Sequence, residues 1–365
     1  MSRRRNPFVS FSFRLTATIF AVALGVSYLS VFSDGEGIFS IVSLFGLYYI
    51  PLLAVNIVLL VMSVARRSAS FLIPLAALLP SLYFLQFYIR VADDNLPDWK
   101  SASELGVTMM TYNVGKFRYA GNGNPDEALA EVADFVGEYD PDIVAFQEFY
   151  VSDPDAVESR FSDYPYCSKY LFRTSSGNYF GNVTFSKFPI ESSGKIKFDG
   201  STNLVLYSDI DIGGSTIRVY NQHLESNSIS LASLIKKISG RDDSFSEELV
   251  NAHEKLINSN ERRGRQVRTL LDDVSSSGGM ALLCGDVNDT PMSYSFRTLR
   301  RGRKDTFTQA GDGFGASYSV LWPLLRIDYI FVPENYDVLL HITPRVGFSD
   351  HYPVLASFII KDENE

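Results

Sequence analysis

The sequence predicts a layered α/β protein, with two mixed β-sheets flanked by helices and three membrane-spanning helices before them. After residue 104, strand-like apolar runs outnumber helical ones, so most neighbouring strands cannot be joined by crossover helices. Several of these runs end in an acid, an amide or a histidine, whereas residues 13–89 are nearly free of charge. Two mixed sheets with helices on their outer faces would bury such runs in a layered sandwich.

Three apolar stretches near the amino terminus predict a membrane anchor over residues 1–91. They are roughly Leu15–Phe32, Ile38–Val64 and Phe71–Ile89. A spanning helix needs about 20 apolar residues; the first and third stretches are close to this length, and the second is longer. Proline occurs in the second and third stretches, which spanning helices tolerate. Arg3–Arg5 before the first stretch also suits a signal peptide, but two more apolar stretches follow and no convincing cleavage site is present.

Basic residues predict the orientation of this integral membrane protein. Arg3–Arg5 and Arg14 precede the first stretch, the first loop has no basic residue, and the second loop carries Arg66 and Arg67. Acidic residues dominate after the third stretch, with Arg90 as the one dissenting charge. By the positive-inside rule, the amino terminus is cytoplasmic and the large domain lies on the extracytoplasmic side of the cell or inner membrane.

Residues 92–104, which include Pro97 and several acids, are predicted to form a linker, and residues 105–362 are predicted to form the large α/β domain. Helical spacing of apolar residues predicts helices over Asp126–Glu138 and about Glu247–Val274. Ser239–Ser246 is interpreted as an exposed loop. The predicted strands are Val107–Asn113, Asp142–Glu148, Asn182–Ser186, Leu204–Ile212, Ile217–Gln222, Met280–Gly285, Asp328–Val332, Val338–Thr343 and Val354–Ile360.

The charge distribution argues against non-specific nucleic-acid binding. The net charge of the chain is −9, and all of this excess is carried by the region after Lys100. Nucleic-acid binding relies on neutralising phosphates with basic groups. The basic run Glu261–Arg268 is interpreted as a solvated helix face. Of the two cysteines, Cys284 is expected in the core, and a disulfide to Cys167 is neither required nor excluded by the spacing.

Polar side chains end four apolar runs: Thr111–Val114, Phe146–Glu148, Cys284–Asn288 and Phe348–His351. Burying so many polar groups is costly unless they bind something. A metal ion and a phosphate would suit this set.

The order of these motifs resembles the endonuclease/exonuclease/phosphatase superfamily of metal-dependent phosphoesterases, from about Val107 to Ile360. The remaining fragments that match the family pattern are Gly181–Ile190, Asn221–Leu224 and Arg326–Phe331. The resemblance implies a four-layer α/β sandwich and hydrolysis of a phosphoester with a divalent cation, usually Mg²⁺, with Mn²⁺ as an alternative. The attached membrane segments and the stretch from Asn221 are similar to the branch of glycosylphosphatidylinositol-anchor lipid remodellers and sphingomyelinase-like enzymes.

The resemblance implies a metal site built from Glu148, Asn113 and Asp350. Glu148 would be the main ligand, because Mg²⁺ prefers oxygen and needs only one or two carboxylates. Asn113 would support the metal or a phosphate oxygen. Asp350 would bind the metal or its water.

The resemblance also implies five catalytic residues. Asp328 would orient His351, and either His351 or Asp286 would act as the base, with Asn288 holding Asp286 or the phosphate in place. His223 would donate to a non-bridging phosphate oxygen. His253 and His341 match no motif and are interpreted as structural or surface residues.

The function expected from these inferences is in-line attack of water on a phosphodiester by a membrane-anchored enzyme, on a lipid head group or another phosphoester. The alternatives are an anchored nuclease of the same fold and a binding module without activity. Ser349 is excluded from a triad with Asp350 and His351, because adjacent side chains of a strand point to opposite faces. Trp322 is expected either on a loop near the site, where it would suit a lipid substrate, or in the core.

Overall fold

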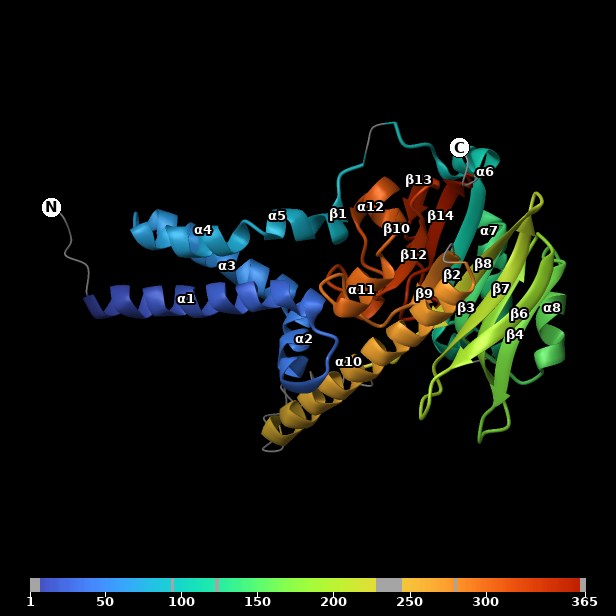
Figure 1. Cartoon of the computed structure of the whole chain (residues 1–365), viewed down its shortest axis with the longest axis horizontal. Helices are drawn as coiled ribbons and strands as arrows, with labels where there is room; N and C mark the ends of the chain where they lie inside the picture. Colours follow the sequence, from blue (N-terminus) through green and yellow to red (C-terminus); the bar gives the residue numbers. More distant parts are fainter. Residues whose placement is uncertain (1–6, 93–94, 122–124, 228–244, 279–280, 362–365) are drawn as a thin grey trace. The chain divides into compact units, whose positions relative to one another are not determined.

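The computed structural model describes residues 7–92, 95–121, 125–227, 245–278 and 281–361. The chain forms two compact units (Figure 1). The first unit contains Met1–Gln86, Asn227–Gly264 and Asp289–Arg297, and the second contains Phe87–Ser226, Arg265–Asn288 and Thr298–Glu365. Two segments from beyond the linker therefore group with the apolar helices. The predicted loop Ser239–Ser246 falls largely outside the described residues.

The first unit consists mainly of apolar helices. They are α1 (Pro7–Leu29), α2 (Ser40–Leu47), α3 (Tyr49–Ala65), α4 (Leu72–Leu78) and α5 (Ser81–Phe84). Two helical segments, Phe8–Phe32 and Ala69–Phe87, are long and apolar enough to cross a membrane. The expected second span is a bent pair, since α2 and α3 meet at 67°. Pro51 lies in the first turn of α3, where its ring cannot fit against the carbonyl of Leu47, and this explains the break.

The second unit contains two six-stranded mixed sheets. The first has the order β10 (Arg303–Asp305), β12 (Asp328–Pro333), β9 (Ala281–Asp286), β8 (Ser215–His223), β7 (Leu204–Ile212) and β6 (Ile190–Lys197). The second has the order β13 (Asp337–Ile342), β14 (Val354–Ile359), β2 (Val107–Asn113), β3 (Ile143–Val151), β5 (Tyr179–Ser186) and β4 (Tyr166–Arg173). Two pairs, β2–β3 and β8–β9, are parallel, and the other described pairs of these sheets are antiparallel. The prediction of mixed sheets is confirmed.

The sheets pack face to face, and helices cover their outer faces (Figure 1). Met109, Ile143 and Ala145 of one sheet join Val219 and Leu282 of the other in one buried cluster. Helices α7 (Pro125–Tyr139) and α8 (Val157–Arg160) cover the second sheet. The carboxyl-terminal part of α10 (Phe245–Ser276) covers the first sheet, where the Tyr220 hydroxyl donates to Asp273 at 2.6 Å. The remaining helices are α6 (Trp99–Leu105), α11 (Tyr294–Leu299) and α12 (Thr306–Ala310).

Several elements differ from the sequence prediction. The predicted linker contains α6, which Asp98 caps by accepting a hydrogen bond from the Ser101 amide at 2.7 Å. Strand β6 was not predicted, because it is a partly exposed edge strand whose sequence has few apolar residues. A two-stranded sheet of β1 (Ile89–Arg90) and β11 (Gly313–Phe314) was also not predicted.

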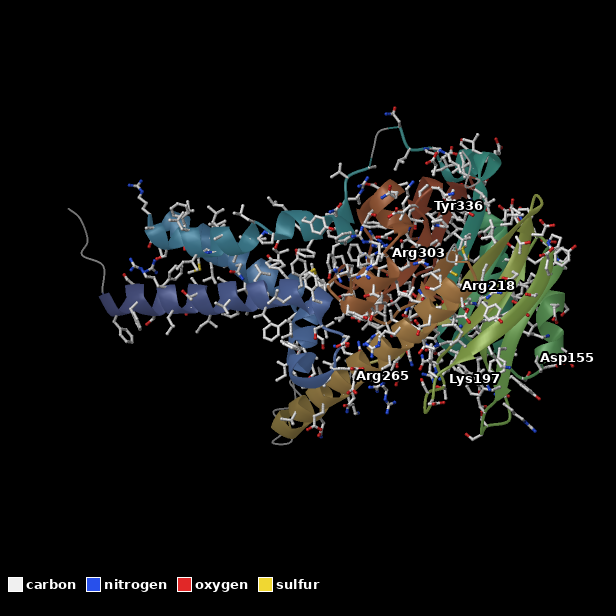
Figure 2. All side chains as sticks on the ribbon, in the orientation of Figure 1. Asp155, Lys197, Arg218, Arg265, Arg303 and Tyr336 are labelled. Carbon is white, nitrogen blue, oxygen red and sulfur yellow. The ribbon has the colours of Figure 1, made fainter. Side chains whose placement is uncertain are left out.

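The basic run on α10 is only partly a solvated face. Arg265 is exposed and labelled in Figure 2. Arg263 is fully buried and donates to the side chains of Asn227 and Asn260, each at 2.8 Å. The interpretation is therefore wrong for Arg263. Its charge is compensated by Asp289, whose Oδ2 lies 3.4 Å from the Arg263 Nε. Two other expectations are confirmed: Cys284 is a buried free thiol, and His341 is a buried structural residue bonded to Thr306.

Candidate active site

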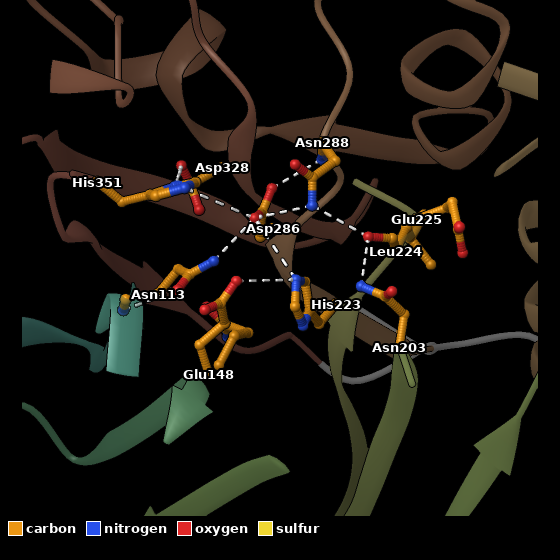
Figure 3. A network of polar contacts seen from close by, with 12 residues as sticks. Asn113, Glu148, Asn203, His223, Leu224, Glu225, Asp286, Asn288, Asp328 and His351 are labelled. Carbon is orange, nitrogen blue, oxygen red and sulfur yellow. Dashed lines mark hydrogen bonds and ion pairs between the residues drawn. The ribbon is translucent and has the colours of Figure 1, made fainter. Parts of the chain in front are cut away.

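The site lies where strand ends of both sheets meet at one rim. His223, Asp286 and Asp328 are direct neighbours across β8, β9 and β12. In the other sheet, Asn113 ends β2 opposite Gln147. The parallel pairs β2–β3 and β8–β9 present their carboxyl ends at the same edge, and residues more than 170 positions apart therefore meet (Figure 3).

Two site residues have left-handed backbone conformations. Glu148 has φ = 53° and lies at the bulge where the pairing of β3 with β5 shifts between Phe146 and Phe149. Asn288 has φ = 56° just after β9. Such conformations cost about 1–3 kcal/mol each and are concentrated at functional sites. At Glu148 the bulge re-aims a side chain that would otherwise follow the alternation of the strand.

Asp286 is the centre of the site. Its carboxylate accepts from Asn113 Nδ2 at 2.9 Å, from the Asn288 amide at 2.7 Å and from Asn288 Nδ2 at 3.0 Å. Burial raises the pKa of Asp286 to about 7, the negative charge of Asp328 adds to this, and His351 and the hydrogen bonds oppose it. Near neutral pH this carboxyl group can therefore both hold and release a proton.

His351 is held between two carboxylates. Its Nδ1 lies 2.9 Å from Asp328 Oδ2, and its Nε2 lies 3.8 Å from Asp286 Oδ2. Burial disfavours the charged ring, but Asp328 and Asp286 outweigh burial and raise the pKa of His351 to about 10. The ring is therefore an imidazolium at neutral pH, with its Nε2–H directed at the centre of the site.

The His223 ring, unlike that of His351, is neutral. Burial lowers its pKa, against the smaller effect of Glu148. Its Nε2 lies 3.7 Å from Glu148 Oε1 and 4.0 Å from Asp286 Oδ2, and this buried atom has no hydrogen-bond partner among the described residues. The neutral ring thus presents an unpaired nitrogen to the space between Glu148 and Asp286 (Figure 3).

Ser349 positions its neighbours and is not a free nucleophile. Its hydroxyl donates to the Asn113 carbonyl at 2.7 Å and accepts from the His351 amide at 3.2 Å. Asp350 lies against Gly115, and its Oδ1 is 3.3 Å from the Ser349 hydroxyl. Asp350 thus borders the site through Ser349, and its charge contributes to raising the pKa of His351.

The residues at this rim fit a divalent cation. Ligand atoms of Asp286, Asp328 and His351 all lie within 4.8 Å of one another, and the Glu148 carboxylate is nearby. Asp328 Oδ1 is buried without a hydrogen-bond partner among the described residues. Burial and the charge of Asp328 raise the pKa of Asp286, and a cation bound to oxygen ligands would relieve this repulsion. The ligand roles of Glu148, Asn113 and Asp350 stay predictions.

A buried amide network behind the site was not predicted from the sequence. Gln147 Nε2 donates to Asn221 Oδ1 at 2.8 Å, and Asn182 Nδ2 donates to the Asn221 carbonyl at 3.0 Å. These bonds join β8 of the first sheet to β3 and β5 of the second. The available signal was the presence of amides inside apolar strand runs, since such groups are buried only when they are hydrogen-bonded.

Comparisons with known proteins agree with this fold. The sequence matches the Endonuclease/Exonuclease/phosphatase family over residues 110–351. The structure is similar to an endonuclease/exonuclease/phosphatase from Beutenbergia cavernae (19% identity, TM-score 0.53, 70% of this chain and 71% of that one). It is also similar to one from Bacteroides vulgatus (17% identity, TM-score 0.50, 70% of this chain and 99% of that one). No curated protein matches the sequence.

Proposed function

Because the chain belongs to the endonuclease/exonuclease/phosphatase family, we propose that it is a membrane-anchored, divalent-metal-dependent phosphodiesterase. Its proposed substrate is a lipid head group, cleaved by in-line attack of water. The observation that carries the proposal is that the cationic ring of His351 and the neutral ring of His223 both face Asp286, with the Glu148 carboxylate next to His223. These groups can bind a phosphate, hold a water and exchange its proton.

Asp286 is the proposed base. Its pKa near 7 lets it accept a proton from an attacking water at neutral pH. Asn113 and Asn288 hold its carboxylate in one orientation. His351, whose pKa is about 10, is already protonated and is unsuited to be the base. This charge difference favours Asp286 over His351, the two candidates that the sequence left open.

His351 and His223 are the proposed phosphate-binding groups. The His351 imidazolium would donate from Nε2 to a phosphoryl oxygen, while Asp328 holds Nδ1 and keeps the ring charged. His223 would donate from Nε2 if Nδ1 is the unprotonated nitrogen, which satisfies the orphaned atom. Donors aimed at oxygens that gain charge in the transition state lower the barrier most.

Glu148 is the proposed principal metal ligand, with Asn113 and Asp350 completing or supporting the site. A bound Mg²⁺ or Mn²⁺ would supply Lewis-acid polarisation of the phosphoryl group. Glu148 suits this role because the strand bulge directs its carboxylate to the rim next to His223. Its partial exposure leaves room for the waters that Mg²⁺ retains.

The anchor is proposed to comprise three spans, with the catalytic unit outside the cytoplasm. Two long apolar helices support this, and the bent pair α2–α3 would form the third crossing. The basic residues before the first span and between the second and third favour a cytoplasmic amino terminus. An odd number of spans then puts the catalytic unit on the other side.

The function is tested with the full-length chain in lipid nanodiscs. Mg²⁺ or a chelator is added with a phospholipid, a sphingolipid, single- and double-stranded DNA, or bis(p-nitrophenyl) phosphate. We expect Mg²⁺-dependent release of a head group and little cleavage of DNA. Asp286→Asn should abolish the release, whereas Asp337→Asn, a change at a surface carboxylate paired with Lys361, should retain it. Cleavage of DNA alone would establish the nuclease alternative, and no cleavage of any substrate would favour a binding module.

A further inference from the structure

The chain that follows the last apolar span is fixed to the catalytic unit. Ile89 and Arg90 form β1 and pair with Phe314 and Gly313 of β11. The Gly315 amide donates to the Tyr88 carbonyl at 3.0 Å. These bonds begin within two residues of Phe87, where the candidate span Ala69–Phe87 ends. Two extended residues reach about 7 Å, so the chain itself ties β11 to the end of that span.

Strand β11 opens a loop that exposes large apolar side chains. We call residues 314–325 the aromatic loop. Its exposed apolar side chains are Phe314 (45%), Val320 (51%), Trp322 (36%) and Leu324 (36%). Exposed large apolar groups gathered in one segment mark an interaction surface more often than isolated ones do.

Trp322 is held at the surface and is not part of the core. Its ring meets Phe314 edge-on at 5.7 Å, and the Arg345 guanidinium lies over it at 4.0 Å. A cavity of about 230 Å³, lined by these three side chains and others, lies beside it. Of the two expected positions for Trp322, the loop is confirmed. Tryptophan is enriched at the membrane–water interface, where its amphipathic ring lies at the level of the head groups.

The middle of the aromatic loop lines the active site. Ser317 Oγ accepts from the Asp328 amide at 3.0 Å, and the Ser319 amide donates to the Asp350 carbonyl at 2.8 Å. Tyr318 forms a β-bridge with His351, and their rings lie 5.3 Å apart. A single segment therefore joins the end of the span to the residues around the catalytic imidazole.

We propose that the aromatic loop rests in the head-group layer of the bilayer that holds the span Ala69–Phe87, and that the site takes its substrate from that layer. This inference rests on the proposed function, since it requires the span to be inserted. The bilayer is the occupant that the structure favours, because β1–β11 pairing makes the loop continuous with a membrane-spanning segment.

Tryptophan fluorescence tests bilayer contact without relying on activity. The chain has two tryptophans, Trp99 and Trp322, so Trp99→Phe leaves Trp322 as the only reporter. In full-length protein in nanodiscs, we expect phosphatidylcholine brominated high in its acyl chains to quench Trp322 at least twofold. The matched Trp322→Phe variant reports on Trp99, whose indole donates to the Tyr139 carbonyl within the catalytic unit, and should be quenched little. Equal quenching of the two variants, or none, would overturn the proposal.

A second experiment tests substrate presentation. Val320→Ser with Leu324→Ser should lower the ratio of bilayer-lipid turnover to bis(p-nitrophenyl) phosphate turnover about tenfold. Leu105→Ser with Ile359→Ser alters exposed apolar residues elsewhere on the catalytic unit and should leave the ratio unchanged. An unchanged ratio in the loop variant would overturn the role in presentation, even if Trp322 is quenched.

If wild-type protein hydrolyses neither substrate with metal, the proposed function fails, while the quenching result still decides bilayer contact. Quenching by an added soluble protein but not by brominated lipid would indicate a protein partner and overturn the proposal.

Discussion

Nδ1 of His351 lies 2.9 Å from Oδ2 of Asp328, and both groups are buried. Nε2 of the same ring faces Asp286 at 3.8 Å, so the imidazolium ring of His351 lies between two carboxyl groups. The arrangement stabilises a charged imidazole at the rim and leaves Asp286 as a carboxyl group with a pKa of about 7. The two groups thus differ in pKa because of their environments, although their ligand atoms lie within 4.8 Å of one another.

Asp328→Asn should reduce hydrolysis roughly 10²–10⁴-fold, because an amide does not stabilise the imidazolium. The pKa of His351 should fall, so the alkaline limb of the profile of kcat/KM against pH should move to lower pH. Steady-state rates between pH 5 and 10 measure both effects. Asp337→Asn, at the surface, is the control. An unshifted alkaline limb in Asp328→Asn would show that His351 does not depend on Asp328 for its charge.

Metal-free protein should lose stability as the pH rises from about 6.5 to 10. The pKa of His351 is raised from 6.5 to about 10 on folding, so its contribution is complete below pH 6.5 and is lost as the pH passes through 10. Asp286, whose pKa is raised from 3.8 to about 7, acts in the same direction at lower pH. At about 1.4 kcal/mol per pKa unit the effect of His351 is at most a few kcal/mol. Thermal unfolding of the full-length chain in detergent with a chelator measures it.

His351→Gln is the comparison that isolates this contribution, because tyrosines and lysines also titrate in this range. The unfolding temperature of the variant should fall less steeply than that of the wild type between pH 7 and 10. Parallel curves would mean that His351 is not charged in the metal-free protein.

The strands that carry the site could be predicted from the sequence, but the protonation states of the side chains at the site could not. Val107–Asn113 is predicted with the observed bounds, because it is apolar, short and ends in an amide. The prediction ends the next strand at Glu148, whereas β3 continues to Val151 through the bulge. A local pattern does not reveal a left-handed residue inside a strand. The pKa values of Asp286 and His351 depend on distances between separate strands, which no local pattern contains.

Burial of polar groups was equally hidden in the sequence. Arg263 is predicted on a solvated face because its neighbours in the chain are charged. In the interior, however, Asp289 compensates its charge, and Asn227 and Asn260 accept its hydrogen bonds. Asn221 is part of a recognised motif. Its hydrogen bonds from β8 to β3 and β5 could not be predicted, because they depend on how the two sheets pack. Partners distant in the sequence decide both cases.

Gly285→Ala should destabilise the protein by about 2 kcal/mol or more. Gly285 has φ = 124°, and an added Cβ would lie 2.0 Å from the Gln222 carbonyl oxygen, a backbone atom that has little room to move. The strain should also separate Asp286 from His223 and lower activity. Gly137→Ala is the control, since it lies in α7 with open space around it and should be neutral or slightly stabilising. Thermal unfolding compares the two, and equal unfolding temperatures would contradict the expected clash.

Glu148→Gln should weaken Mn²⁺ binding at least tenfold and lower hydrolysis by orders of magnitude, because a neutral amide is a poorer ligand than a carboxylate. Electron paramagnetic resonance of free Mn²⁺ measures affinity independently of turnover. Glu158→Gln is the matched control, because the Glu158 carboxylate is paired with Lys169 at 2.7 Å, and it should bind Mn²⁺ as the wild type does.

Asp286→Asn separates the two possible ligand sets: if Glu148 is the main ligand, Asp286→Asn should retain more Mn²⁺ affinity than Glu148→Gln. The reverse order would place the cation among Asp286, Asp328 and His351, and Asp286 would then be a ligand and not the base.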